Sequence, residues 1–273
     1  MPPDAAASLA RDGYVVLPSD PATRRWAAAA LEAARPSIEG RGAPRRCGGT
    51  WLAGVDLLPN AADGSVDGVP LAGPGPDLVA ALGLRPAVWH RAQVSVTWPG
   101  YPRPDAGESA GAARYRLRRD AAHVDGLLPE GDARRRHLRE PHAFVLGLPL
   151  TPARAEAAPL VVWPGSHRRL GAAFAAARAA APGLPLGEID LTDIYTATRR
   201  EVFDTCPRVP VTAPPGAAIV LHRHMLHGIA PWTAPPDAAW RAVAYFRPEL
   251  PDPEAWAVPE PGGLAAPAAR PGG

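Results

Sequence analysis

The sequence contains no lysine, so all 29 of its basic residues are arginines. This absence excludes Schiff-base chemistry on a lysine amine and a phosphate-binding loop that depends on lysine. Arginine has a planar guanidinium that suits bidentate contacts with carboxylates and phosphates. Every anion-binding role in this chain that needs a permanent positive charge therefore falls to arginine.

Other features are scarce, and each excludes a class of protein. Two cysteines do not make a disulfide framework, and a formal net charge of +2 is too small to indicate a nucleic-acid partner. No apolar run reaches the roughly 18 residues of a membrane span, and the first residues lack the basic and apolar regions of a secretion signal. We expect a cytoplasmic protein that binds neither nucleic acid nor membrane.

Proline and glycine are abundant, with 36 and 27 residues among 273, but they separate apolar runs instead of forming repeats. Together with a hydrophobic content of 47%, this pattern indicates loops between buried elements in a globular protein. We expect a single domain over residues 1–273, with N-terminal helices over about 1–88, a core over about 89–250 and a loose tail over about 251–273.

The core region reads as short β runs separated by turn residues, with helices inserted at about 168–181 and 188–206. The runs are WHRAQVSVTW, AAHVDG, HAFVLGLPLT, PLVVWPGS, RVPVTA, AAIVLHRHMLHG and WRAVAYFRP. Many short strands that close on themselves are typical of a double-sheet jelly roll, whose interior can hold a ligand. The predicted fold class is mainly β with flanking helices outside the barrel.

The N-terminal part is more helical. We expect a helix over 4–12, a strand at Tyr14–Leu17, and a second helix that Ser19 or Asp20 caps and Pro36 ends. A strand over 51–58 and a short helix over 77–84 follow.

Two histidine motifs carry the chemistry. His123 and Asp125 stand two residues apart, so on an extended segment both side chains reach the same face. About a hundred residues later the segment HRHMLHG offers His222, His224 and His227 as a third ligand. Two histidines and one carboxylate make the facial triad of non-haem Fe(II) oxygenases, which leaves positions open for co-substrate and oxygen. The alternative is a hydrogen-bonded polar pair at a strand edge.

With the strands in place, the succession DGYVVLP, HVDG, PLVVWPGSHR, PPGAAIVLHRHMLHG and a basic residue on the next strand resembles the phytanoyl-CoA dioxygenase family. The resemblance covers roughly residues 8–248. It implies a double-stranded β-helix (cupin-like) core that binds Fe(II) and 2-oxoglutarate. The residues that the resemblance implies are His123, Asp125 and His227 as metal ligands and catalytic centre, and Arg241, Gln93 and Ser95 for the co-substrate.

This family resemblance also implies the reaction. 2-Oxoglutarate and O2 would be converted to succinate and CO2 while an unactivated C–H bond of a small molecule is hydroxylated or otherwise oxidised. Two departures, Ile229 and Trp232, stand where relatives often carry polar side chains. Because of these two residues, the alternative hypothesis is a catalytically silent jelly-roll protein that binds a metal or ligand. A third hypothesis is a zinc hydrolase. Such an enzyme usually needs a general base beside the metal, and the spacing of residues in the sequence indicates none.

Several arginines have competing interpretations. Arg241 alternates with Val243 and Tyr245 in a way that directs it inward, and Arg247 is the other candidate for the co-substrate anchor. In an extended segment, Arg114, Arg116 and Arg118 would project to one side and attract an anionic substrate; the alternative is a solvated loop.

Overall fold

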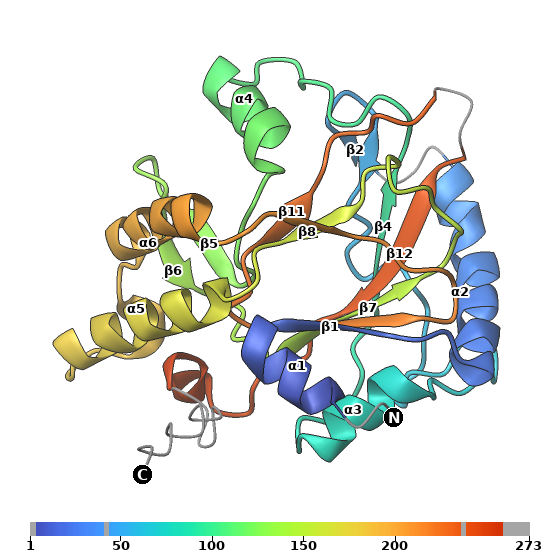
Figure 1. Ribbon diagram of the computed structural model, residues 1–273, viewed down its shortest axis with the longest axis horizontal. Coiled ribbons are helices and arrows are strands. Elements are labelled where there is room, and N and C mark those ends of the chain that lie inside the picture. The colour runs from blue at the N-terminus through green and yellow to red at the C-terminus, as the bar shows by residue number, and fades with distance from the viewer. Residues whose placement is uncertain (1–3, 41–43, 236–238, 259–273) are drawn as a thin grey trace, which may run out of the picture.

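The computed structural model describes residues 4–40, 44–235 and 239–258 (Figure 1). The α-helices are α1 (Ala5–Asp12), α2 (Pro21–Glu39), α3 (Pro74–Ala81), α4 (Ala110–Arg119), α5 (Ser166–Ala180) and α6 (Thr192–Thr205), with 3-10 helices η1 (Leu186–Glu188) and η2 (Pro253–Ala257). The strands are β1 (Tyr14–Leu17), β2 (Arg45–Arg46), β3 (Trp51–Leu52), β4 (Gln93–Thr97), β5 (Leu127–Glu130), β6 (Arg135–Leu138), β7 (Phe144–Pro149), β8 (Leu160–Val162), β9 (Val209–Val211), β10 (Ala218–His222), β11 (His227–Ile229) and β12 (Arg241–Phe246).

The largest sheet has seven antiparallel strands in the order β1-β10-β7-β12-β4-β3-β2. Successive side chains of β12 alternate between its two faces. Ala242, Ala244 and Phe246 join the core under the helices, whereas Val243 and Tyr245 join the core on the opposite face. Because both faces are covered, the central strands are buried throughout their length.

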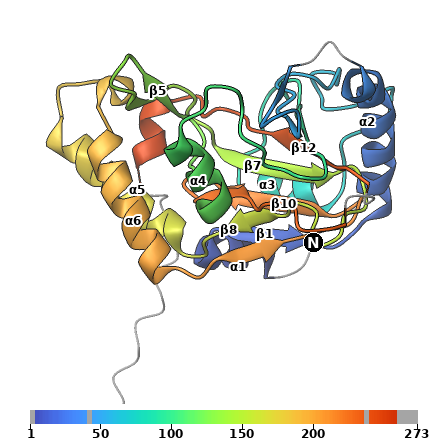
Figure 2. The same ribbon diagram turned by 90° about the horizontal axis from the view of Figure 1, so that it is seen from above.

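A second sheet, β11-β8-β9, contributes Leu160, Val162 and Val211 to the same core as Val243 and Tyr245. The two sheets therefore face one another and enclose an interior, and the helices lie outside them. Figure 2 shows α2 at one end of the molecule and α5 with α6 at the other, with the strands between. This is the predicted mainly β jelly roll with flanking helices.

Helix α2 covers the outer face of the large sheet. Asp20 is its N-cap, since its carboxylate accepts hydrogen bonds from Ala22 N–H at 2.7 Å and Thr23 N–H at 3.3 Å. Trp26 is fully buried against Phe246, with ring centroids 5.8 Å apart. The prediction that Pro36 ends this helix is wrong: the helix continues to Glu39, because Ile38 is buried in the same core and its packing outweighs the hydrogen bond that proline removes.

The N-terminal part is not only helical. Strand β1 pairs with β10 at one edge of the large sheet, and β2 and β3 extend the other edge beyond β4. The strand expected over 51–58 is shorter, at Trp51–Leu52, and the helix expected over 77–84 is shifted to Pro74–Ala81. No helix in the described ranges is both long and apolar enough to cross a membrane.

Helices α5 and α6 pack on each other around a separate core. Phe174 and Tyr195 stack there, and Trp256 of η2 lies 4.9 Å from the Phe174 ring, centroid to centroid. The prediction of a loose tail from residue 251 is therefore wrong for η2, whose buried tryptophan anchors it. The remainder of the predicted tail, 259–273, lies outside the described residues.

The segment before the first histidine motif is helix α4, so Arg114, Arg116 and Arg118 lie neither in the extended segment nor in the solvated loop that the sequence left as alternatives. The Ser109 side chain caps the helix by accepting a hydrogen bond from Ala112 N–H at 3.2 Å, and alanine, arginine and leucine favour helix. Arg114 and Arg118 therefore share a face, whereas Arg116 pairs with Glu108. The geometric argument for an anionic substrate no longer holds.

Candidate metal centre

His123 and His227 are held side by side by backbone pairing. Each donates its N–H to the carbonyl of the other, at 2.8 and 3.0 Å, and their ring centroids are 4.7 Å apart. His227 begins strand β11, which pairs with β8 in the small sheet. The strand predicted over 121–126 is wrong in extent, because only an isolated bridge forms at His123 and the chain turns at Asp125.

Asp125 is the third member of this group of candidate metal ligands. Its Oδ1 lies 3.2 Å from His123 Nε2 and its Oδ2 lies 3.5 Å from His227 Nε2. One ligand atom from each of the three residues lies within 4.8 Å of the other two. Among the described residues, this is the one group of three or more such side chains close enough to share a metal ion. The side chains of His123 and Asp125 thus converge through a turn at Asp125, whereas the sequence predicted that a strand would bring them together.

The two imidazoles are oriented by backbone carbonyls. His123 Nδ1 lies 3.0 Å from the carbonyl oxygen of Ala121, and His227 Nδ1 lies 2.9 Å from that of Met225. A carbonyl oxygen only accepts, so each Nδ1 carries a proton and donates it. In a neutral ring the remaining Nε2 is then a lone pair, and both Nε2 atoms face Asp125. Three electron-pair donors converge on one point, an arrangement that a cation complements.

Arg247 supplies positive charge on the other side of Asp125. Its Nε lies 2.7 Å from Asp125 Oδ2, but the geometry is that of an ion pair without a hydrogen bond. Burial by itself raises the pKa of Asp125, yet the positive charge of Arg247 beside it holds that pKa well below its usual value. The carboxylate is therefore ionised at neutral pH despite an exposure of only 11%.

These residues fit a divalent transition metal. Two imidazole nitrogens and one carboxylate oxygen on one side of an ion leave its remaining positions open. Within the described chain, Asp125 Oδ2 is buried and accepts no hydrogen bond. The site could therefore hold an ion such as Fe(II) through His123, Asp125 and His227.

Gly228 is required for this arrangement, because a Cβ there would lie 2.1 Å from the carbonyl oxygen of Asp120. That oxygen accepts a hydrogen bond from Ile229 N–H at 2.8 Å, so the two segments cannot separate freely. We expect Gly228→Ala to lower the free energy of unfolding by about 2 kcal/mol or more and to weaken metal binding by displacing His227. Thermal unfolding and metal titration measure both effects.

Gly183→Ala is the matched control, since a Cβ at Gly183 meets nothing within 4 Å. If both alanine variants melt at the temperature of the parent protein, the close approach at Gly228 does not constrain the site.

Arg241 lies at the far end of β12 from Arg247, on the inner face with Val243 and Tyr245 as predicted. Its side chain is buried, and it makes no ion pair and donates no hydrogen bond to any residue of the described chain. Directly across on β4 is Thr97, whose buried hydroxyl also lacks a hydrogen-bond partner there. A positive charge on a largely buried side chain is costly without an anion beside it. An anionic group bound at this end of the interior would therefore be stabilised by Arg241.

The other predicted co-substrate residues lie on β4 between these two ends. Ser95 pairs with Val243, and its hydroxyl accepts a hydrogen bond from Trp51 Nε1 at 3.0 Å. Gln93 pairs with Tyr245 and accepts a hydrogen bond from Arg247 through its side-chain oxygen. Gln93 is thus four residues along the strand from Thr97 and accompanies Arg247, not Arg241.

Three residues around Asp125 have contacts that the sequence did not predict. Arg247 was considered only as an alternative anchor, yet it contacts Asp125. His90 and His142 have no motif spacing, but they hold the Arg247 backbone: His90 Nε2 accepts its N–H at 2.7 Å, and His142 Nδ1 donates to its carbonyl at 2.9 Å. No local pattern signals these contacts, because the partners are more than a hundred residues apart in sequence.

The other two histidines of the HRHMLHG segment lie in the core. His224 packs against Phe174 and Trp256, with ring centroids 5.3 and 4.4 Å away, and His222 lies between His224 and His167. Burial, with neighbouring positive groups, lowers the pKa of His222 to about 3 and moves that of His224 in the same direction. Both are neutral structural residues.

This burial predicts an acid-sensitive fold. The unfolded chain takes up protons at His222 and His224 from about pH 6.5 downwards, while the folded protein does not until about pH 3 at His222. Stability is therefore full above pH 6.5 and is lost as the pH falls, by up to about 1.4 kcal/mol per pH unit for each histidine. Urea unfolding of the metal-free protein at several pH values measures this slope. His222→Gln is expected to flatten it, and an unchanged slope would contradict the assignment.

Comparisons with known proteins give structural matches only. No protein-family model matches the chain, and no curated protein matches it. SnoN, a non-heme alpha ketoglutarate dependent epimerase from nogalamycin biosynthesis, is 17% identical, with 97% of this chain and 91% of SnoN covered at a TM-score of 0.48. SnoK, a carbocyclase of the same biosynthesis, is 17% identical, with 95% and 91% covered at 0.48. EctD from S. alaskensis is 18% identical, with 90% and 76% covered at 0.44.

Proposed function

We propose that this protein is an Fe(II)- and 2-oxoglutarate-dependent oxygenase of the phytanoyl-CoA dioxygenase type that oxidises a C–H bond of a small molecule. One observation carries the proposal. Three side chains that can bind a metal converge where His123 pairs with the start of β11, and a buried arginine that lacks a carboxylate partner in the described chain lies on the inner face of β12. A metal and a dianionic co-substrate complement these two features together.

His123, Asp125 and His227 would hold the iron through Nε2, a carboxylate oxygen and Nε2. Iron with 2-oxoglutarate and O2 would supply oxidising power sufficient for an unactivated C–H bond, and succinate and CO2 would be released. The chain's contribution is orientation. The carbonyls of Ala121 and Met225 fix both imidazole tautomers, and Arg247 keeps Asp125 ionised.

Arg241 would bind the far carboxylate of 2-oxoglutarate, with Thr97 Oγ1 as a second donor from the neighbouring strand. The side chains of directly opposed residues on antiparallel strands lie roughly 5 Å apart, so one carboxylate can contact both. Ile229 shares the face of β11 with His227 and adds an apolar wall, not a hydrogen bond. The co-substrate's far carboxylate would depend on Arg241 and Thr97 accordingly.

The surroundings of this anchor exclude water. Tyr101 and Trp232 are buried in one apolar cluster with Cys47, and Ile229 packs against it. Trp232 Nε1 donates to the carbonyl of Ala234 at 3.1 Å, so the polar group of this residue is satisfied inside the apolar cluster. A dry environment strengthens the attraction between Arg241 and a carboxylate.

A spectroscopic and turnover experiment tests the proposal. The protein is reconstituted with Fe(II) and 2-oxoglutarate under anaerobic conditions, and the weak visible charge-transfer band is recorded. Oxygen is then added and succinate is measured. We expect the band, and slow succinate formation even without a primary substrate. If neither is observed while the protein is folded, the alternative of a catalytically silent metal- or ligand-binding jelly roll replaces the oxygenase.

A further inference from the structure

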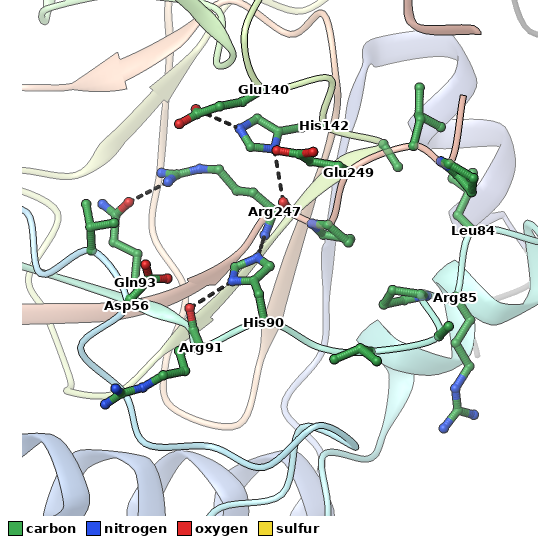
Figure 3. A pocket seen from close by; sticks show the side chains of 18 of the residues that line it. Asp56, Leu84, Arg85, His90, Arg91, Gln93, Glu140, His142, Arg247 and Glu249 are labelled. Carbon is green, nitrogen blue, oxygen red and sulfur yellow. Dashed lines mark hydrogen bonds and ion pairs between the residues drawn. The ribbon is translucent and has the colours of Figure 1, made fainter. Parts of the chain in front are cut away.

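A pocket of ≈ 990 Å³ has Arg247, the residue that contacts Asp125, in its lining (Figure 3). It lies between the segment 83–93, the segment 140–143 and the chain from Arg247 to Pro251, with Val55 and Asp56 at one side. The volume is at the upper end of the range for small-molecule sites. The pocket is therefore large enough for a multi-ring organic molecule.

Arg247 connects this pocket to the triad. Arg247 lines the pocket, places Nε 2.7 Å from Asp125 Oδ2, and donates through Nη1 to Gln93, which also lines the pocket. Figure 3 shows the Arg247 side chain extending towards Gln93, with His90 and His142 against its backbone. The two histidines hold the Arg247 backbone, so the position from which the arginine side chain extends along the pocket is fixed.

The wall facing the triad offers hydrogen-bond donors. Gln93 uses its oxygen to accept from Arg247, which directs its amide NH2 elsewhere, and the guanidinium of Arg247 has more N–H groups than its contacts with Gln93 and Asp125 occupy. The complementary group on a ligand is an oxygen that accepts: a hydroxyl, an ether or a carbonyl. A ligand held in this way lies next to the side chain that contacts Asp125.

The charges of the pocket exclude a polyanion. Its three arginines are balanced by three carboxylates, those of Asp56, Glu140 and Glu249. Two of the guanidiniums are already engaged, because Arg247 pairs with Asp125 and Arg91 donates to the carbonyls of Leu58 at 3.2 Å and Leu57 at 3.3 Å. Nucleotides and coenzyme A thioesters need an excess of arginine or lysine, which this pocket lacks.

The remaining surface of the pocket is apolar, with side chains that include Val55, Leu84, Pro86, Val88 and Leu250. We propose that the pocket is the substrate site of the oxygenase and that it takes an uncharged, oxygen-bearing, mainly apolar molecule, not a coenzyme A thioester or another polyanion. This inference rests on the proposed function, because it assigns the pocket to the same reaction.

Binding of matched ring probes tests the chemical class. The protein carries Mn(II) and 2-oxoglutarate without oxygen, and 7-methoxycoumarin, coumarin-3-carboxylate and coenzyme A are titrated by ligand-observed NMR. A probe of this size is expected to bind with a Kd of about 1 mM, at roughly 0.3 kcal/mol per non-hydrogen atom. We expect 7-methoxycoumarin to bind at least about tenfold more tightly than the carboxylate, and its protons to relax faster with Mn(II) than with diamagnetic Zn(II).

Variants place the probe in this pocket. Val55→Trp and Ala87→Trp change exposed lining residues and should weaken 7-methoxycoumarin binding severalfold by filling the space. Leu184→Trp is the matched control, because Leu184 is exposed and lies outside the lining. Glu249→Arg changes the charge of the pocket by two units and should shift preference towards coumarin-3-carboxylate. The charge-transfer band and the uncoupled succinate formation should be unaffected by Leu184→Trp, the substitution outside the pocket.

The outcomes separate the two proposals. If coenzyme A or the carboxylate binds as tightly as 7-methoxycoumarin, or if 7-methoxycoumarin fails to bind, the assigned substrate class is wrong even when succinate forms. If 7-methoxycoumarin binds Val55→Trp and Ala87→Trp as tightly as the parent protein, or shows no Mn(II)-dependent relaxation, the pocket is not the substrate site. If the band and succinate are absent while binding follows the expected pattern, the proposed function is wrong and the pocket is a ligand site of another kind.

Discussion

Asp125→Ala is expected to abolish succinate formation and to weaken divalent metal binding by more than about 100-fold, beyond the loss typical of outer-shell residues. The physical reason is that Asp125 is the only charged member of the triad and is ionised in the folded protein. Without it, two neutral imidazoles face the cationic Arg247 across the site. Anaerobic calorimetric titration with Fe(II) or Mn(II) measures the metal affinity, and circular dichroism checks that the fold is intact.

Asp132→Ala is the control for this variant, since Asp132 is an exposed aspartate in the turn between β5 and β6. It should bind metal and form succinate as the parent protein does. Full activity of Asp125→Ala would overturn the facial triad, and a collapsed circular dichroism spectrum would call for the milder Asp125→Asn, which keeps the side-chain shape but lacks the charge. Asp125→Asn is expected to lose metal affinity in the same direction.

Arg241→Ala is expected to raise the KM for 2-oxoglutarate by about 30-fold to 1000-fold, which corresponds to roughly 2–4 kcal/mol for a desolvated charge pair. Thr97→Val should raise the same KM severalfold, because it removes one neutral donor and leaves the guanidinium. Both substitutions act at the end of the interior away from Asp125, so metal binding should stay near that of the parent protein. Initial rates of succinate formation against 2-oxoglutarate concentration, with separate metal titrations, test this.

Arg247→Ala is the matched arginine variant. Its contact with Asp125 predicts a change in metal affinity, with a much smaller effect on the KM for 2-oxoglutarate. The reverse pattern, in which Arg247→Ala raises that KM more than Arg241→Ala does, would assign the anchor to Arg247. Comparison of the two therefore separates an arginine that binds the co-substrate from one that contacts a metal ligand.

Local patterns predicted the parts of the fold that depend on side-chain alternation and capping. The β runs at 93–97, 144–149 and 241–246 alternate or are apolar throughout, as strands buried between layers must be. Asp20 caps α2 through its own side chain, which sequence alone can indicate. Boundaries were less accurate where packing decided them, as at Pro36 and at η2, where Ile38 and Trp256 hold the chain against separate cores.

For the candidate site, the sequence motifs and the family resemblance that they carry indicated His123, Asp125 and His227 as candidate metal ligands, and the structure brings these three side chains together. The sequence also determined the inward direction of Arg241 through the strand period. Only the tertiary structure showed how His227 reaches His123 while His222 and His224 lie in the core, since the bridge between His123 and His227 is a long-range contact. Likewise, it alone placed Arg247 on Asp125 and Gln93 beside it. Those contacts arise where three segments distant in sequence meet, and no local periodicity encodes such a meeting.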